Sequence, residues 1–433
     1  MDTPTTVLVV SFFVLLVLNV PVAFCMGIAA VLAFVAMGNM PAFTATAHNI
    51  ATGIDSFALL AIPFFILSGL LMDRGGIARR LIDFASVLVG RFRGGLALVN
   101  VLTCMLFGAI SGSATAAVSA VGGFMVPLMS RKGYNHEFNA AVTITAATTG
   151  LLIPPSNIMI VYSLATGGAV SIAAMFMAGY LPGILVGLGL IVVSTIISVR
   201  HNYGRGETFG LREGVWKFLG AIPALLLIFI VIGGILKGWF TPTEASAVAV
   251  LYTFLLSVVF YREVKIKDLP TILLRCGITT SVVFMLIGTS MAMSWVLSAQ
   301  NVPQNISAAL MSLTSNKVIV LLIINALLLV VGMFMDMTPA VLIFTPIFLP
   351  VVAKFGVHPL HFGIIIIMNL CIGLCTPPVG TCLFLGCGIA GTTVTKIMRP
   401  ILPFFVSMIV TLLICTFVPQ ISLWVPDLFG LLK

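Results

Sequence analysis

Charge is the property that this sequence has least of. Only 8% of the 433 residues are charged, whereas a soluble domain carries about 25%. Apolar runs long enough to cross a membrane recur along the chain, and they do not alternate with polar residues as the strands of a membrane barrel do. The composition therefore excludes a soluble globular protein and predicts an all-α polytopic membrane protein.

The N-terminus lacks the features of a cleaved signal peptide. No basic segment precedes its first apolar run, and no small-residue cleavage site follows it, which predicts a retained first helix. The net charge of +9 comes without a basic stripe and interleaved aromatic residues. Membrane lipid is therefore expected around the chain, and nucleic acid is not expected as a partner.

The cysteines lack the spacing of a metal site. Cys371, Cys375, Cys382 and Cys387 cluster within one apolar region, but their spacing fits no zinc or iron–sulfur pattern. We expect these side chains to pack as small apolar groups. No cofactor and no resident metal are predicted.

Prolines are present where a membrane helix should be continuous. The stretch CIGLCTPPVG, residues 371–380, contains Pro377 and Pro378 inside a long apolar run. Proline removes a backbone donor and clashes with the preceding turn, so a helix is expected to break there. Because broken backbone is not tolerated against lipid, this segment is predicted to line an interior site.

The chain contains a weak internal repeat. A shift of 223 residues places TGLLIPPSN, residues 149–157, on IGLCTPPVG, residues 372–380, so that a glycine and both prolines coincide. The longest polar stretch, residues 199–217, separates the two halves. Glycine and proline determine backbone shape, so their coincidence predicts two structural repeats.

Each half predicts the same order of elements, with about ten transmembrane helices, two re-entrant hairpins and two broken helices in all. The first repeat covers 1–198, with scaffold helices in 1–72, an arm helix at 73–93, a hairpin at 94–130, a broken helix at 137–165 and a helix at 172–198. A cytoplasmic linker follows at 199–217. The second repeat covers 218–433, with scaffold helices in 218–298, an arm helix at 300–316, a hairpin at 317–354, a broken helix at 359–391 and a helix at 398–425.

The basic residues predict that the second repeat is inverted. An odd number of crossings in each half turns the second half over. With the linker in the cytoplasm, every Lys and Arg lies on the cytoplasmic side except Lys237, Lys317, Lys354 and Lys433. This distribution follows the positive-inside rule and predicts that both termini lie outside.

Inverted repeats with discontinuous helices are typical of transporters. The hairpin tips, AISGSATAA and GMFMDMTPA, supply hydroxyl groups and one acidic residue, Asp336. An intramembrane carboxylate indicates function, and hydroxyls with freed carbonyls suit Na⁺ better than a proton relay. The alternative is that Asp336 only caps the second helix of its hairpin.

A second acidic residue is expected to have a structural role. In WFTPTEASAVAV, Thr241 is predicted as the N-cap of a helix, Pro242 as its first residue and Glu244 as the partner in a capping box. A direct ion-binding role for Glu244 is the less favoured interpretation.

Five motifs, in order, carry a resemblance to a known family: SGSATAA, IPPS, FTPTEA, GMFMDMTP and GLCTPPVG. Together they resemble the large membrane subunit of tripartite ATP-independent periplasmic (TRAP) transporters, over essentially the whole chain. The resemblance implies a transporter rather than an enzyme, located in the bacterial inner membrane. It implies sodium-coupled uptake of an organic acid, such as a dicarboxylate, keto acid or sugar acid, by an elevator motion. The implied partners are a periplasmic substrate-binding protein and a small membrane subunit on a separate chain.

The resemblance also implies site residues. Cation ligands would come from each hairpin tip and the facing broken helix: Ser111, Ser113, Gly150, Pro154, Asn157, Gly332, Asp336, Thr338, Gly373 and Thr376. The substrate carboxylate would lie near Ser113, Thr115, Ser156, Asp336 and Thr381. Many members of the family carry an Asp shortly after the first tip, but residues 113–118 of this chain contain none.

Two other classes remain open. A sodium-coupled anion carrier of related elevator fold that needs no binding protein would transport with this chain alone. An integral subunit of an energy-converting enzyme would need buried Lys and Glu relays or cofactor ligands, for which the sequence offers no pattern.

Overall fold

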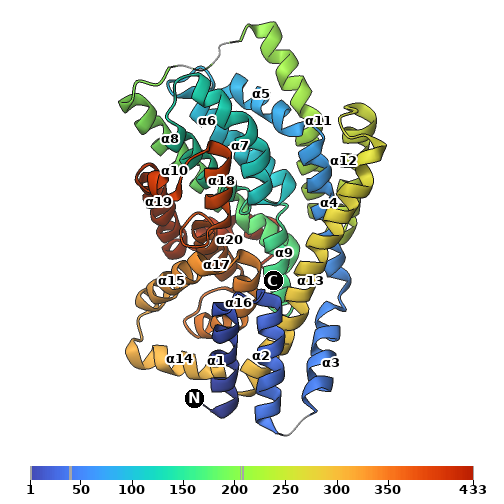
Figure 1. Cartoon of the computed structure of the whole chain (residues 1–433), viewed down its shortest axis with the longest axis vertical. Helices are drawn as coiled ribbons and strands as arrows, with labels where there is room; N and C mark the ends of the chain where they lie inside the picture. Colours follow the sequence, from blue (N-terminus) through green and yellow to red (C-terminus); the bar gives the residue numbers. More distant parts are fainter. Residues whose placement is uncertain (1, 39–40, 205, 207–208, 433) are drawn as a thin grey trace.

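The computed structural model describes residues 2–38, 41–204, 206 and 209–432. All regular elements within these residues are helical (Figure 1), and the predicted fold class, an all-α polytopic membrane protein, is confirmed. Arg205 and Lys433, which were counted in the charge distribution, lie outside the described residues.

The chain begins with four helices, whereas the apolar runs at about 5–18, 20–38 and 54–72 predict three. The four helices are α1 (Thr3–Val17), α2 (Val22–Met37), α3 (Ala42–Ile54) and α4 (Ala61–Arg74), the last entered through a 3₁₀ turn at Phe57–Leu60. The unpredicted α3 is short and rich in Thr, so it has no spanning pattern. It packs on α2 and α13 (Leu269–Ala299), where Gly288 leaves no room for a side chain beside Ile50.

The rest of the first half alternates short and long helices. They are α5 (Ile77–Val89), α6 (Gly95–Ser111), α7 (Ala114–Arg131), α8 (His136–Thr149), α9 (Asn157–Ala165) and α10 (Ile172–Arg200). α6 and α7 form a hairpin with its tip at residues 111–114. The break between α8 and α9 contains Pro154 and Pro155, which are joined by a cis peptide bond.

The second half follows the same order. Its helices are α11 (Leu211–Leu236), α12 (Pro242–Phe254), α13, α14 (Val302–Leu313), α15 (Lys317–Phe334), α16 (Met337–Lys354), α17 (Pro359–Gly373), α18 (Thr381–Ala390), α19 (Val394–Phe417) and α20 (Gln420–Leu428). α12 continues as a π-helical turn at Leu255–Phe260, and a 3₁₀ turn at Ile266–Asp268 precedes α13. α15 and α16 form the second hairpin, and Pro377 and Pro378, also joined by a cis bond, lie between α17 and α18.

Two predicted elements have different bounds in the structure. The last helix, expected at 398–425, is two helices, because the backbone leaves helical geometry at Val418 before Pro419. The expected linker at 199–217 is helical at both ends, since α10 continues to Arg200 and α11 begins at Leu211. Eight helices in the described residues are long and apolar enough to cross a membrane. Six of them belong to the ten expected crossings, and the other two are the hairpin arms α15 and α16.

The helices form two groups. One group, here called the scaffold, contains α1–α4 and α11–α13, with α4 packed on α12 and α13. The other, here called the hairpin body, contains α6–α10 and α15–α20. Within the hairpin body, α7 packs on α18 and α16 packs on α9, so each hairpin contacts the broken helix of the other half. Figure 1 shows α4, α12 and α13 along one side, α8, α17 and α18 on the other, and α9 between them.

Local backbone features also match between the halves. Gly133 and Gly356, 223 residues apart, both adopt left-handed conformations, with φ of 84° and 67°. Two residues later, Asn135 and His358 both cap a helix, accepting hydrogen bonds from the amides of Phe138 and Leu360. These matches support the proposal that the halves are structural repeats.

Candidate functional site

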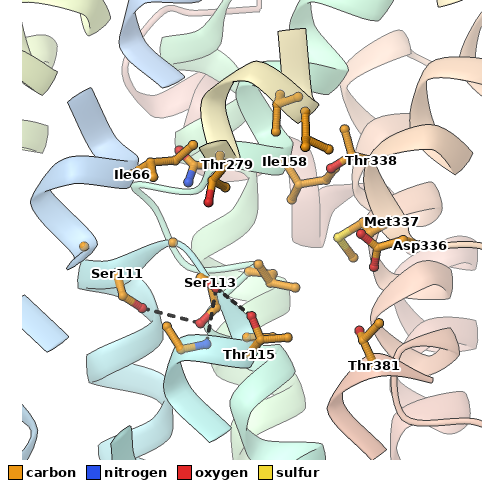
Figure 2. Close-up of a pocket in the computed structure, with 18 of the residues that line it drawn as sticks. Ile66, Ser111, Ser113, Thr115, Ile158, Thr279, Asp336, Met337, Thr338 and Thr381 are labelled. Atoms are coloured by element: carbon orange, nitrogen blue, oxygen red, sulfur yellow. Dashed lines mark hydrogen bonds between the residues drawn. The ribbon is translucent and has the colours of Figure 1, made fainter. Parts of the chain in front are cut away.

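The two hairpin tips face each other across one cavity of about 670 Å³ (Figure 2). Residues of both tips, α9 and α18 line it from the hairpin body, and residues of α4 and α13 line it from the scaffold. Its polar lining residues are Asp73, Ser111, Ser113, Thr115, Ser119, Asn157, Thr279, Asp336, Thr338 and Thr381. The cavity has the size of a small-molecule site.

The first tip concentrates hydroxyl groups. α6 ends at Ser111, Gly112 turns the chain with φ of 62°, and Ser113 caps α7 by accepting a hydrogen bond from the Ala116 amide at 3.3 Å. The Ser113 and Thr115 hydroxyls are 3.1 Å apart, and the Ser111 hydroxyl donates to the Ser113 carbonyl at 3.5 Å. The turn thus presents several oxygen atoms to the cavity.

Unpaired oxygens of the first broken helix lie beside this tip. A Cβ atom on Gly112 would be 3.4 Å from both the Pro155 carbonyl oxygen and Asn157 Nδ2. Ser156 Oγ and Asn157 Oδ1 are buried and have no hydrogen-bond partner among the described residues. Oxygen atoms of this kind suit a cation, and buried side-chain oxygens away from the cavity, such as Ser194 Oγ and Ser198 Oγ, also lack a partner among the described residues.

The second tip places a carboxylate at the equivalent position. Asp336 occupies the N-cap of α16, but its side chain makes no capping hydrogen bond. Pro339, at the third position of α16, has no N–H to donate, although the adjacent amide of Met337 interacts with the carboxylate. This geometry does not favour the interpretation of Asp336 as a simple helix cap.

Glycines bring each hairpin onto its own broken helix. A Cβ atom on Gly150 would be 2.2 Å from Gly108 Cα, and one on Gly373 would be 2.5 Å from Gly332 Cα. The amide of Val379 also donates to the carbonyl of Met333 at 3.1 Å. These glycines therefore permit backbone contact between hairpin and broken helix, and they do not line the cavity.

The structure brings together part of the predicted site. The members that line the cavity are Ser111, Ser113, Thr115, Asn157, Asp336, Thr338 and Thr381. Those that do not line it are Gly150, Pro154, Ser156, Gly332, Gly373 and Thr376. The Thr376 hydroxyl donates to the Ile372 carbonyl at 2.7 Å, within its own helix.

The scaffold wall was missed by the sequence analysis. It includes Asp73 near the end of α4 and Thr279 of α13, and Ser119 of α7 lies on the cavity beyond the first tip. Asp73 was assigned to the basic arm helix at 73–93, and Thr279 to an ordinary scaffold helix. Gly69 of α4 packs directly on the first tip, where a Cβ atom would be 2.7 Å from the Ser111 carbonyl oxygen.

The second acidic motif has the predicted structural role. Glu244 Oε2 accepts a hydrogen bond from the Thr241 amide at 2.8 Å, and the Glu244 amide donates to Thr241 Oγ1 at 3.3 Å. The capping box at the start of α12 is therefore confirmed. Glu244 does not line the cavity.

Comparison with known proteins identifies relatives over nearly the whole chain. The chain is 49% identical to the uncharacterized protein YgiK of Salmonella typhimurium, covering 99% of this chain and 98% of that protein. It is 41% identical to the C4-dicarboxylate TRAP transporter large permease protein DctM of Pseudomonas aeruginosa, covering 87% of this chain and 88% of the relative.

The fold also has a solved counterpart. The YdaH transporter of Alcanivorax borkumensis superimposes with a TM-score of 0.63, covering 90% of this chain and 89% of that chain at 15% sequence identity. This likeness establishes the fold alone. The family described as the tripartite ATP-independent periplasmic transporter, DctM component, matches residues 9–421. The chain therefore belongs to the DctM family and is the large permease subunit of a TRAP transporter.

Proposed function

We propose that this subunit carries out sodium-coupled uptake of an organic acid across the bacterial inner membrane by an elevator motion of the hairpin body against the scaffold. The observation that carries the proposal is the cavity where both hairpin tips meet α4 and α13. Discontinuous helices at such an interface free the backbone groups that bind ions and substrate in secondary transporters.

The chemistry of the lining supports cation coupling. Asp73 and Asp336 line the cavity, and its described lining residues include no Lys, Arg or His. A carboxylate substrate would be repelled by these side chains unless cations entered with it. Ser156 Oγ and Asn157 Oδ1, with the carbonyls near the first tip, provide oxygen ligands for Na⁺.

The position of the cavity supports an elevator motion. Its walls belong to two groups of helices that contact each other where α4 packs on α6 and α9 and where α13 packs on α16. Among these contacts, Gly69 lies on the first tip, and Phe65 of α4 also lies against Phe176 of α10, with ring centroids 6.4 Å apart. A cavity bounded by two packed bodies changes its access when one body slides against the other.

Partners and substrate class follow from the family. A tripartite system implies a periplasmic binding protein and a small membrane subunit beside the large permease. The relative named as a C4-dicarboxylate permease supports an organic acid as the substrate. We propose that the hydroxyls of Ser113, Thr115 and Thr381 hold its carboxylate between the tips.

The membrane orientation has a direct test. We propose that the end of the molecule with α5 is cytoplasmic and the end with α14 is periplasmic; Figure 1 places these helices at opposite ends. Asn305 and Arg79 are exposed on α14 and α5. In intact cells, an impermeant thiol reagent should label Asn305→Cys and spare Arg79→Cys. Equal labelling of both would contradict the orientation.

The transport proposal is tested by reconstitution. Proteoliposomes that contain this chain and its small membrane subunit, supplied with the binding protein, should take up substrate when a sodium gradient is imposed. Liposomes with this chain alone should be inactive. Uptake without a sodium gradient would overturn the coupling, and sodium-driven uptake by the chain alone would place it with carriers that need no binding protein.

A further inference from the structure

The scaffold contributes a carboxylate, that of Asp73, to the cavity. This group is not among the cation and substrate ligands proposed on the hairpin tips and broken helices. Asp73 lies near the end of α4, and Thr279 lies on the neighbouring helix α13, so both belong to the scaffold wall of the cavity. Asp73 is half-buried, and the Thr279 side chain is exposed to the cavity (Figure 2). Asp73 and Asp336 therefore contribute negative charge to the cavity from different groups of helices, the scaffold and the hairpin body.

Neighbouring cations do not cancel the charge of Asp73 by direct contact. Arg74 and Arg275 are near enough to interact electrostatically with it, but both are exposed and neither lines the cavity. The ion pairs recorded between described residues join Lys217 to Asp83 and Glu213, and none includes Asp73. A carboxylate without an ion-pair partner on the wall of a cavity acts on any charged molecule that passes it.

We propose that Asp73 is a specificity-determining residue that sets the charge selectivity of the cavity. Its carboxylate attracts cations to the scaffold wall and opposes an organic anion whose charge is not neutralised by bound cations. This inference rests on the proposed transport of an organic acid. A unit charge about 4 Å away in water changes the local concentration of a monovalent ion by about fivefold.

The location of Asp73 on the scaffold gives this selectivity a direction. The ligands near the tips move with the hairpin body in an elevator cycle, whereas Asp73 stays with α4. Asp73 therefore acts on the substrate only while the cavity lies against this part of the scaffold. In that arrangement its charge favours departure of the anion once the accompanying cations have dissociated.

The test measures charge selectivity without transport. Ser119 is exposed and lines the cavity, while all eight native cysteines are buried. In the purified full chain carrying Ser119→Cys, the rates of modification by a cationic and an anionic methanethiosulfonate reagent are compared at low salt, with the parent chain as background. We expect the cationic reagent to react faster.

Matched variants assign the effect. Asp73→Asn should lower the ratio of cationic to anionic rates by about fivefold, and Asp73→Glu should retain it. Asp427→Asn, an exposed position on α20 outside the cavity, should leave the ratio unchanged. The change in this ratio caused by Asp73→Asn should become smaller at high salt, because salt screens the charge. A merely structural role of Asp73 would not depend on salt in this way. An unchanged ratio in Asp73→Asn overturns the proposal.

A gain of charge provides the second arm. Thr279→Asp adds a carboxylate to the same wall and should raise the ratio, and combining it with Asp73→Asn should restore the original value. If Asp73→Asn does not fold, failure of Thr279→Asp to raise the ratio overturns the proposal. Reconstituted uptake is measured separately, so uptake that does not depend on sodium, together with an intact charge effect, refutes the proposed sodium coupling and leaves the charge selectivity assigned to Asp73 standing.

Discussion

Ser113 and Asp336 both begin the second arm of a hairpin, yet only the side chain of Ser113 caps its helix. The first tip satisfies its hydroxyls internally and leaves unpaired oxygens on the facing broken helix. The second tip instead holds a carboxylate without a capping bond. The two tips therefore share backbone geometry but differ in the polar group that they present to the cavity, a hydroxyl at the first and a carboxylate at the second. Under the proposed function, the second tip depends more on a bound cation.

The largest effect is expected from removing the charge of the second tip. Asp336→Asn keeps the shape of the side chain and removes the carboxylate. We expect the variant to express and assemble normally, while the sodium concentration for half-maximal uptake rises by about tenfold or more, or uptake is lost, because the proposed cation would lose the carboxylate that pairs with it. Wild-type sodium dependence in reconstituted Asp336→Asn would show that the two tips are functionally equivalent.

A large effect on stability is expected where the second hairpin contacts its broken helix. Gly373→Ala would place a methyl group 2.5 Å from Gly332 Cα, and overpacking of this kind costs about 1–3 kcal/mol. Thermal unfolding of the purified protein should show a lower Tm. The control is Gly388→Ala on α18, where a Cβ atom would contact nothing within 4 Å. Equal Tm values for both variants would contradict the tight packing.

A smaller effect is expected from the cap of the first tip. Ser113→Ala removes the acceptor for the Ala116 amide, which costs about 1 kcal/mol at a helix N-cap. Apparent sodium affinity should fall by about fivefold, less than in Asp336→Asn. Ser113→Thr keeps a hydroxyl and should recover most of the loss. If Ser113→Ala lowers the apparent sodium affinity more than Asp336→Asn does, the first tip contributes more to cation binding than the second, contrary to this prediction.

The smallest functional effect is expected away from both tips. Thr241→Ala removes the capping box of α12 and should lower stability by about 1 kcal/mol. Sodium dependence should not change, because neither Thr241 nor Glu244 lines the cavity. Thermal unfolding and uptake are measured on the same preparation. A change in sodium dependence here would mean that scaffold stability alone alters coupling, and the comparison of the tips would lose its control.

Sequence patterns predicted the elements whose physics is local. Prolines at 154–155 and 377–378 located both breaks, and long apolar runs located most of the helices. α3 was not predicted, because its 13 residues include Thr, His and Asn and form no apolar pattern of spanning length. This helix is stabilised by packing on α13. The tips were accessible from sequence because their polar residues interrupt apolar arms.

The scaffold wall was not accessible from sequence. Asp73 precedes a basic segment and looks like part of a solvated helix end, and Thr279 is an ordinary residue of a spanning helix. Their proximity to the tips results from packing between segments far apart in the chain. Glycines at 150, 332 and 373, which are predicted as cation ligands, lie at backbone contacts between hairpin and broken helix; their role in cation binding stays a prediction.

The close contact of Gly69 with the first tip also offers a means of preparing a different conformer. A methyl group at this position would act as a wedge, since it would press on the Ser111 carbonyl from 2.7 Å away. The wedge would penalise the arrangement described here and not one in which the tip has slid along α4. Because about 1.4 kcal/mol changes a population ratio tenfold, a single Gly69→Ala substitution would enrich the opposite state for structure determination.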